Sequence, residues 1–301
     1  MSKKTKPFFS TTAEMVCLLR AKSFNEKREF YKSDDYVSVL ISHSLNSFLS
    51  IMHKSFVLGF DGFNPMLPAG IYEYVVARTR YIDNLFSTLP AGTSHVFILG
   101  AGYDSRGFRF QETLKSCLVY ECDHPDMQTH KRRLLENINI DYPANVKFVP
   151  IDFSNNSFDE WIKSLDLKPK NSCFFLLEGL TMYLSPQQMK SILHTVSQVA
   201  AGQCRLFFDY AYAEVIRGEY GGYNEAECIA EVRTVGEPWK FGIEKSALAE
   251  FLQPYRLAVV DEMTSRDIEH SQFTDQDGRC HGHVIDSVAW VLAQRINEAG
   301  L

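Results

Sequence analysis

The chain has 301 residues, of which 45% are hydrophobic, and this is enough to bury one large core or a core with an added cap. Its formal net charge of -6 disfavours a general nucleic-acid surface, because binding to phosphates needs concentrated lysine and arginine. No uncharged apolar stretch reaches about 18 residues, so no membrane span is expected, and seven scattered cysteines without a C-x-x-C pair suit the reducing cytoplasm.

The first 90 residues show helical rather than strand periodicity, and they predict an N-terminal helical cap over residues 1–90. The expected helices cover residues 11–32, 34–58 and 70–88. Asp34 and Asp35 are suited to cap the second helix, since their side chains can accept hydrogen bonds from backbone N–H groups. A loop rich in glycine and proline separates the second helix from the third.

From residue 95 onward, apolar runs typical of buried strands alternate with helical patterns. Strands are expected at residues 95–100, 117–123, 146–151, 172–178, 204–210 and 256–262. Helices are expected between them at residues 104–113, 125–138, 157–165, 186–200 and 245–253. A final apolar run, residues 284–293, is either the last strand or a helix. The alternation predicts an α/β fold with a doubly wound, seven-stranded, mostly parallel sheet, in a core over residues 91–301.

Residues 211–242 interrupt this alternation, and they contain several aromatic residues and glycines. An insertion after the fifth strand lies near the carboxyl ends of the strands, where open α/β sheets bind their ligands. Together with the N-terminal helices it forms either a lid over a substrate or ordinary packing. The one dense basic run, residues 131–133, is expected on a solvated helix face.

The most informative segment is a buried strand, residues 95–99, that runs into the glycine-rich turn GAGYDS. An acidic strand end follows about 20 residues later, which is the spacing of a nucleoside-binding β-α-β unit. Gly100 and Gly102 let the backbone approach a ligand closely. Ser105 stands where a dinucleotide fingerprint has its third glycine, and this argues for an adenosine ligand without pyrophosphate, namely S-adenosylmethionine.

Several acidic residues near this turn have both a ligand-binding and a structural interpretation. Asp104 lies where a helix N-terminus faces the ligand, and it is also a good helix cap. Glu121 or Asp123 can accept hydrogen bonds from ribose hydroxyls, or can pair with or cap the next helix. Asp152 can accept from the adenine amine while Phe153 packs on the ring, or it can cap the loop that follows.

Five ordered motifs closely resemble the leucine carboxyl methyltransferase family, which also holds bacterial O-methyltransferases of natural-product pathways. The motifs are ARTRYID at 77–83, LGAGYDSR at 99–106, YECDHP at 120–125, DF at 152–153 and LEGLTMYL at 177–184. The resemblance is strong over residues 70–200 and looser elsewhere. It implies a Rossmann-like class I methyltransferase fold with S-adenosylmethionine as the cofactor.

The resemblance also implies roles for individual residues. Arg78 looks like the arginine that pairs with the methionine carboxylate of the cofactor, as a guanidinium group can do with two parallel hydrogen bonds. Gly100 looks like the glycine that contacts the cofactor, and Asp123, ranked above Glu121, like the acid that binds ribose. Asp152 and Phe153 look like the pair that contacts adenine.

Further positions follow from the same resemblance. Glu178 looks like the acidic residue beside the cofactor's amino group, and Tyr183 like the tyrosine that lines the methyl-transfer site. Some members use an N-terminal basic residue, for which Arg20 is the candidate and Lys22 the alternative. Gly107 departs from the family pattern, and it either leaves room for a ligand or permits close packing.

The expected reaction is transfer of a methyl group from S-adenosylmethionine to an oxygen atom. A carboxylate acceptor is already ionised at neutral pH, whereas a hydroxyl needs a general base. Tyr183, Tyr210, Asp209 and the histidines are the candidates for that base, although the pair at 209–210 has a structural interpretation as the end of a strand. The sequence does not choose among them.

The expected methyl acceptor is a small natural product of the polyketide or non-ribosomal peptide type. The alternatives are a protein C-terminus, as in the branch of the family that modifies phosphatase 2A, and a different class of enzyme, an NAD(P)-binding oxidoreductase. Cys280 and His283 lack further ligands at a suitable spacing, so no metal site is predicted. The oligomeric state is not predicted.

Overall fold

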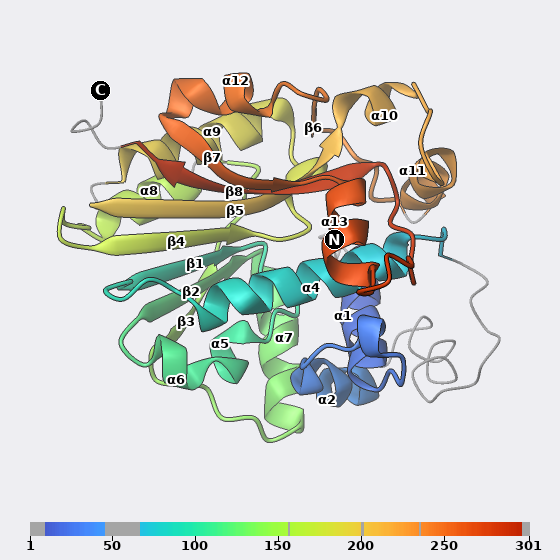
Figure 1. The fold of residues 1–301 in the computed structure, drawn as a ribbon. Helices are drawn as coiled ribbons and strands as arrows, with labels where there is room; N and C mark the ends of the chain where they lie inside the picture. Colours follow the sequence, from blue (N-terminus) through green and yellow to red (C-terminus); the bar gives the residue numbers. More distant parts are fainter. Residues whose placement is uncertain (1–9, 46–66, 156, 200–201, 235, 297–301) are drawn as a thin grey trace, which may run out of the picture.

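The computed structural model describes residues 10–45, 67–155, 157–199, 202–234 and 236–296. Its sheet has the strand order β3-β2-β1-β4-β5-β8-β7, and the short β6 pairs with the end of β5 (Figure 1). Strands β1 to β5 are parallel, whereas β8 runs antiparallel to both of its neighbours. The strands are β1 (His95–Leu99), β2 (Leu118–Asp123), β3 (Val146–Pro150), β4 (Ser172–Leu177), β5 (Gln203–Tyr212), β6 (Gly242–Ile243), β7 (Leu257–Met263) and β8 (Val288–Arg295).

Helices cover both faces of the sheet, as the alternation of elements predicts. The α-helices are α1 (Thr11–Phe24), α2 (Tyr36–Ser44), α4 (Ile71–Ser87), α5 (Arg106–Arg109), α6 (Gln111–Leu114), α7 (Pro125–Asn137), α8 (Ser157–Ser164), α9 (Pro186–Gln198), α10 (Ala213–Arg217), α11 (Glu225–Thr234), α12 (Leu248–Leu252) and α13 (Ser265–Phe273). Three short 3-10 helices span Glu29–Tyr31, Thr181–Tyr183 and Gln253–Tyr255. Within the described residues, no helix has the length and apolar character needed to cross a membrane.

The two faces are packed by alternate residues of the strands. In β1, Phe97 belongs to the cluster that contains side chains of α8, α9 and α12. Its neighbours Val96 and Ile98 belong to the opposite cluster, with side chains of α4 and α13. Because α4 covers one face of the sheet, part of the region 1–90 lies within the layered core, while α1 and α2 pack against α7. The division at residue 90 stays a prediction.

Several elements differ from their expected extents. The final apolar run is a strand, β8, and the helical alternative is wrong. Helix α13 was not expected, although the capping box formed by Thr264 and Asp267 is a recognisable start signal. Helix α1 ends at Phe24 rather than near residue 32. Helix α2 is capped by Asp35, whose carboxylate accepts from the Ser38 N–H group across 3.1 Å, and the remainder of the helix expected at 34–58 lies largely outside the described residues.

The predicted insertion starts as a continuation of the sheet, because β5 runs on to Tyr212. It then contains α10 and α11, which lie beyond the carboxyl ends of the parallel strands (Figure 1). The end of the insertion returns to the sheet: the Lys240 N–H group donates to the Met182 carbonyl across 2.7 Å, and Ile243 pairs with Tyr212. The insertion is therefore placed next to the loop after β4.

Candidate cofactor site

A cavity of about 410 Å³ lies at the carboxyl ends of β1, β2 and β4, between these strands, α1 and the insertion. Eight of the predicted site residues line it: Arg20, Arg78, Gly100, Gly102, Asp104, Asp123, Glu178 and Tyr183. Five do not: Glu121, Asp152, Phe153, Asp209 and Tyr210. The fold thus gathers residues from five segments of the chain into one cavity, as expected for an open α/β sheet.

The glycine-rich turn holds its conformation only with glycine. Gly100 has a φ of +67° and Gly102 a φ of +45°, a region that side-chain-bearing residues rarely adopt. A Cβ atom on Gly100 would also lie 2.9 Å from a methyl group of Leu180. The Gly102 N–H group donates to Asp123 Oδ2 across 2.6 Å, so the turn is fixed to the end of β2. The backbone and one carboxylate are therefore presented to the cavity together.

The two acidic residues of β2 have different environments. Asp123, at the strand end, lines the cavity, and burial raises its pKa, while N–H groups of Gly102 and His124 oppose the shift. Glu121 is fully buried, two residues further back under α5 and α7, and pairs with Lys131 across 2.5 Å. Burial raises the pKa of Glu121 to about 7, against the effect of Lys131. The ribose-binding prediction for Glu121 is thus not supported, and the expectation that Lys131 faces solvent is wrong.

Arg78 on α4 makes two buried ion pairs. Its Nε donates to Glu178 Oε1 across 3.0 Å, and its Nη1 donates to Asp209. Asp209 is fully buried and also accepts from the Tyr74 hydroxyl and the Gly179 N–H group. Burial alone would raise the pKa of Glu178, but the surrounding guanidinium groups lower it overall. Asp209 is therefore a partner of Arg78 and is not part of the cavity wall.

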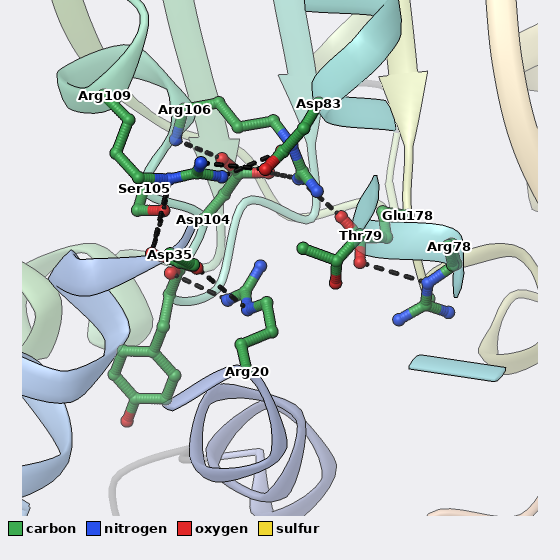
Figure 2. A network of polar contacts seen from close by, with 12 residues as sticks. Arg20, Asp35, Arg78, Thr79, Asp83, Asp104, Ser105, Arg106, Arg109 and Glu178 are labelled. Carbon is green, nitrogen blue, oxygen red and sulfur yellow. Dashed lines mark hydrogen bonds and ion pairs between the residues drawn. The ribbon is translucent and has the colours of Figure 1, made fainter. Parts of the chain in front are cut away.

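The sequence reasoning assigned no role to Arg106, although the residue belongs to one of the motifs that carry the family resemblance. Arg106 is fully buried, and its Nη1 donates to both Asp104 and Glu178 across 2.6 Å (Figure 2). Its Nε donates to Asp83 Oδ1 across 2.7 Å. Arg109, also unassigned, pairs with Asp83 as well. Arg106 thus joins two carboxylates of the cavity wall to one on α4.

Ser105, which replaces the third glycine, has a structural role. Its hydroxyl donates to Asp35 across 2.7 Å and accepts from Arg109 Nε across 2.8 Å, so it connects the turn to the cap of α2. Asp104 stands one residue before Ser105, the N-cap of α5, and its carboxylate accepts from the Arg106 N–H group across 2.7 Å. A Cβ atom on Gly107 would lie 3.1 Å from Glu121 Oε1, so this glycine permits close packing rather than leaving room for a ligand.

The pair expected at adenine is not part of the cavity wall. Asp152 accepts from the Ser154 N–H group across 2.8 Å, and hydrogen bonding with Ser154 lowers its pKa. The ring of Phe153 packs near that of Phe158, with centroids 5.9 Å apart. This arrangement matches the alternative interpretation of Asp152 as the cap of its own loop. A role for either residue at adenine stays a prediction.

Of the candidate bases, which are Tyr183, Tyr210, Asp209 and the histidines, only Tyr183 is among the described residues that line the cavity, and burial raises its pKa to about 12. Tyr210 points to the other face of the sheet, since neighbouring residues of a strand alternate, and its hydroxyl donates to Glu262 across 2.7 Å. The sequence predicted that Asp209 and Tyr210 lie together at the methyl site, and the structure corrects this position. Strand β5 continues to Tyr212, and both side chains are internal.

The two N-terminal candidates are separated by the structure. Arg20 lines the cavity, donates to the Tyr103 carbonyl across 2.9 Å and lies 3.4 Å from Asp35. Lys22, two residues along α1, has its ammonium group 4.6 Å from the ring centroid of Tyr72 and is not part of the wall. Arg20 is thus the better placed of the two.

Cys280 and His283 lie outside the cavity, on the loop after α13. Together with Glu269 they bring three potential ligand atoms within 4.8 Å of one another. Each group has a partner within the protein: the thiol donates to the Gly282 carbonyl, and Glu269 accepts from the Val284 N–H group and lies 3.5 Å from His283 Nδ1. The prediction of no metal site stays a prediction.

The strand order and the glycine turn define a class I methyltransferase fold. Among solved structures, the fold is similar to that of a candidate methyltransferase from Thermobifida fusca YX, with a TM-score of 0.58. The match covers 94% of this chain and 95% of that one at 15% identity, so the likeness concerns the fold alone.

The model of the leucine carboxyl methyltransferase family matches residues 13–197, more than half of the chain. The chain therefore belongs to this family. The family resemblance seen in the motifs is confirmed, and the alternative of a nicotinamide-dependent oxidoreductase is set aside.

Two relatives are named as candidate S-adenosyl-L-methionine-dependent methyltransferases. YktD of Bacillus subtilis (strain 168) is 29% identical over 205 residues, which make up 67% of this chain and 66% of YktD. A protein of Mycobacterium sp. (strain JLS) is 27% identical over 263 residues, 86% of this chain and 82% of its own length. The match thus spans just under two thirds of the Bacillus protein.

Proposed function

We propose that this chain is an S-adenosylmethionine-dependent O-methyltransferase and that the cavity at the carboxyl ends of β1, β2 and β4 holds the cofactor. Family membership and the convergence of the predicted residues on one cavity support the proposal. Asp123 binds the ribose hydroxyls, and the turn at Gly100 and Gly102 lies against the cofactor. Arg78 takes the cofactor's carboxylate, and Glu178 its ammonium group.

The chemistry requires little of the protein beyond positioning. The sulfonium group of the cofactor already activates its methyl group, which is transferred in line to the acceptor oxygen. The S–C bond breaks as the O–C bond forms, and the electron pair of the broken bond stays on sulfur. Holding the two reactants in this geometry can lower the barrier by as much as about 7–11 kcal/mol. The wall residues thus act by binding and orientation.

The acceptor oxygen that the geometry supports best is a carboxylate. The observation that carries this choice is the state of the candidate bases: Tyr183 keeps its proton at neutral pH, and Asp209 and Tyr210 lie outside the cavity wall. Among the described wall residues there is no histidine. A carboxylate acceptor is ionised at neutral pH and needs no base. The methyl ester that forms is neutral, so no proton has to be moved.

A small acceptor fits the apolar part of the cavity wall. That part includes Ile71, Val75, Met182 and Trp239. Glu237 of the insertion accepts from Thr11 N across 2.9 Å and from Ser10 Oγ across 3.2 Å, so the insertion and the start of α1 are joined beside it. This closure favours a small, partly apolar carboxylic acid, such as a natural product, over the C-terminus of a folded protein.

The test is incubation of the purified protein with labelled S-adenosylmethionine and a library of small carboxylic acids and matched alcohols, followed by mass analysis. A methyl product that is released by mild base is an ester and supports the proposal. A base-stable ether would contradict the carboxylate assignment, and labelling of protein C-termini alone would contradict the small acceptor. Calorimetric binding of NAD but not S-adenosylmethionine would overturn the function as a whole.

A further inference from the structure

We propose that a buried network of charged residues, partly in the cavity wall and partly behind it, makes the site favour a cationic ligand, so that it holds S-adenosylmethionine in preference to the neutral product S-adenosylhomocysteine. The proposal rests on the assignment of the cavity as the cofactor site. It adds a property of that site: part of the charge that distinguishes substrate from product belongs to residues that do not line the cavity.

The network is continuous and alternates in sign. Each neighbouring pair is an ion pair within 4.0 Å. Figure 2 shows the network from Arg20 to Arg78, and the pair between Arg78 and Asp209 extends it to β5. In order, its members are Arg20, Asp35, Arg109, Asp83, Arg106, Glu178, Arg78 and Asp209, with Asp104 as a branch on Arg106. Four guanidinium groups face five carboxylates, which leaves a formal excess of one negative charge.

The network is buried, and the opposite charges within it favour the charged forms of Glu178 and Arg106. The exposed fraction of its side chains runs from 0% to 14%, the largest being that of Asp83. The pKa of Glu178 is lowered and that of Arg106 is raised despite burial, because each faces opposite charges. Salt screens such buried charges much less than surface charges. The excess charge therefore acts on whatever occupies the adjoining cavity.

The remaining charged residues of the cavity wall do not cancel this excess. They are Asp123, Glu237 and Lys240, of which Lys240 is exposed and the two carboxylates are not. Two carboxylates and one ammonium group leave a further negative charge on the wall. A cavity of this kind attracts a cation more strongly than a neutral molecule of the same shape.

The two forms of the cofactor differ by one charge. S-adenosylmethionine carries a sulfonium group, an ammonium group and a carboxylate, which give a net charge of +1, and S-adenosylhomocysteine lacks the sulfonium charge. When the methyl group moves to a carboxylate, the sulfonium and the acceptor anion are both neutralised. The network then loses its electrostatic attraction to the product, and product release is favoured.

The test is calorimetric binding of three ligands to variants that change the network charge without changing the cavity wall. The ligands are S-adenosylmethionine, S-adenosylhomocysteine and sinefungin, in which a protonated carbon-bound amine replaces the methylated sulfur. Asp83→Asn removes the excess negative charge, and Arg109→Gln doubles it; neither residue lines the cavity. Glu112→Gln, at an exposed carboxylate outside the network, is the matched control for net charge.

For Asp83→Asn we expect the preference for S-adenosylmethionine over S-adenosylhomocysteine to fall about 5-fold, and for Arg109→Gln we expect it to rise by a similar factor. Sinefungin should follow S-adenosylmethionine in both variants, and Glu112→Gln should change nothing. If Asp83→Asn fails to fold, Arg109→Gln still tests the proposal, because in this variant the preference for S-adenosylmethionine is expected to rise. The proposal is overturned if each variant changes the affinity for S-adenosylmethionine and the affinity for S-adenosylhomocysteine by the same factor.

A separate variant distinguishes failure of the charge proposal from failure of the assignment of the cavity as the cofactor site. Asp123→Ala should weaken binding of all three ligands, because it removes a contact to the ribose that they share. If Asp123→Ala leaves every affinity unchanged, the cavity is not the cofactor site. If it weakens all of them while the network variants leave the preference unchanged, only the charge proposal fails.

Discussion

Arg106 Nη1 donates to Glu178 Oε2 across 2.6 Å, and this contact joins the helix after the glycine turn to the end of β4. The same nitrogen donates to Asp104, which lines the cavity beside the turn. One buried guanidinium group thus fixes the separation of two carboxylates that belong to distant parts of the chain. The spacing of the cavity wall depends on a residue that is not itself part of the wall.

Replacing Arg106 should destabilise the fold and weaken cofactor binding together. Arg106→Gln leaves buried carboxylates without their partner, which is expected to cost about 3–5 kcal/mol of unfolding free energy. Arg106→Lys should recover only part of the loss, since one ammonium group cannot reproduce the planar fork. Urea unfolding and calorimetry measure both effects. Arg133→Gln, at an exposed position on α7, is the control, and equal stability of the two glutamine variants would contradict the prediction.

Asp123 should matter more for the cofactor than for stability. Hydrogen bonds to a charged group contribute about 1.5–3 kcal/mol each, so Asp123→Ala should weaken S-adenosylmethionine binding at least about tenfold. The affinity of Asp123→Asn for S-adenosylmethionine should lie between those of the wild type and Asp123→Ala, because this variant keeps one acceptor oxygen. Titration calorimetry gives the affinities, with Asp141→Ala at an exposed site as control. Unchanged binding in Asp123→Ala would rule out the ribose role.

Glu121 should make stability depend on pH. Its pKa is raised to about 7 in the folded protein, so the folded state binds more protons than the unfolded state between about pH 4.5 and pH 7. The free energy of unfolding should therefore fall across this range, by about 3 kcal/mol at most, and level off above it. Glu121→Gln should remove this dependence. Urea unfolding from pH 5 to pH 8 measures it, with Glu136→Gln, an exposed position on α7, as control. A difference in unfolding free energy between wild type and Glu121→Gln that stays constant over this range would disprove the assignment.

Tyr183 should contribute to positioning rather than to proton removal. A general base contributes about 100- to 10,000-fold to the rate, and a hydroxyl that keeps its proton at neutral pH does not supply this. We expect Tyr183→Phe to lower kcat less than about tenfold and to leave the pH profile unchanged. Steady-state assays from pH 6 to pH 9 test this, with Tyr36→Phe, an exposed position, as control. If the pH profile of kcat for Tyr183→Phe lacks a limb that the wild-type profile shows, Tyr183 is the base.

Local sequence signals predicted most of the fold and part of the site. The apolar runs and the glycine turn placed β1 to β5 within a few residues, because buried parallel strands have a distinctive composition. Helix α13 was missed because a short polar helix has little apolar periodicity. The motif positions Gly100, Asp123 and Glu178 gathered at one cavity because each lies at or directly after the carboxyl end of a parallel strand.

The sequence by itself determined the family, the type of sheet and the segments that meet at the cavity, since these depend on local patterns. Only the tertiary structure decided which side chains face the cavity. Asp209 and Tyr210 are neighbours in the chain but lie on opposite faces of β5, and the strand had to be placed before either direction was known. Arg106 acquired its role in the same way, because its partners Asp83 and Glu178 are brought to it by other elements. Ion pairs between distant segments leave no periodic trace in a single sequence.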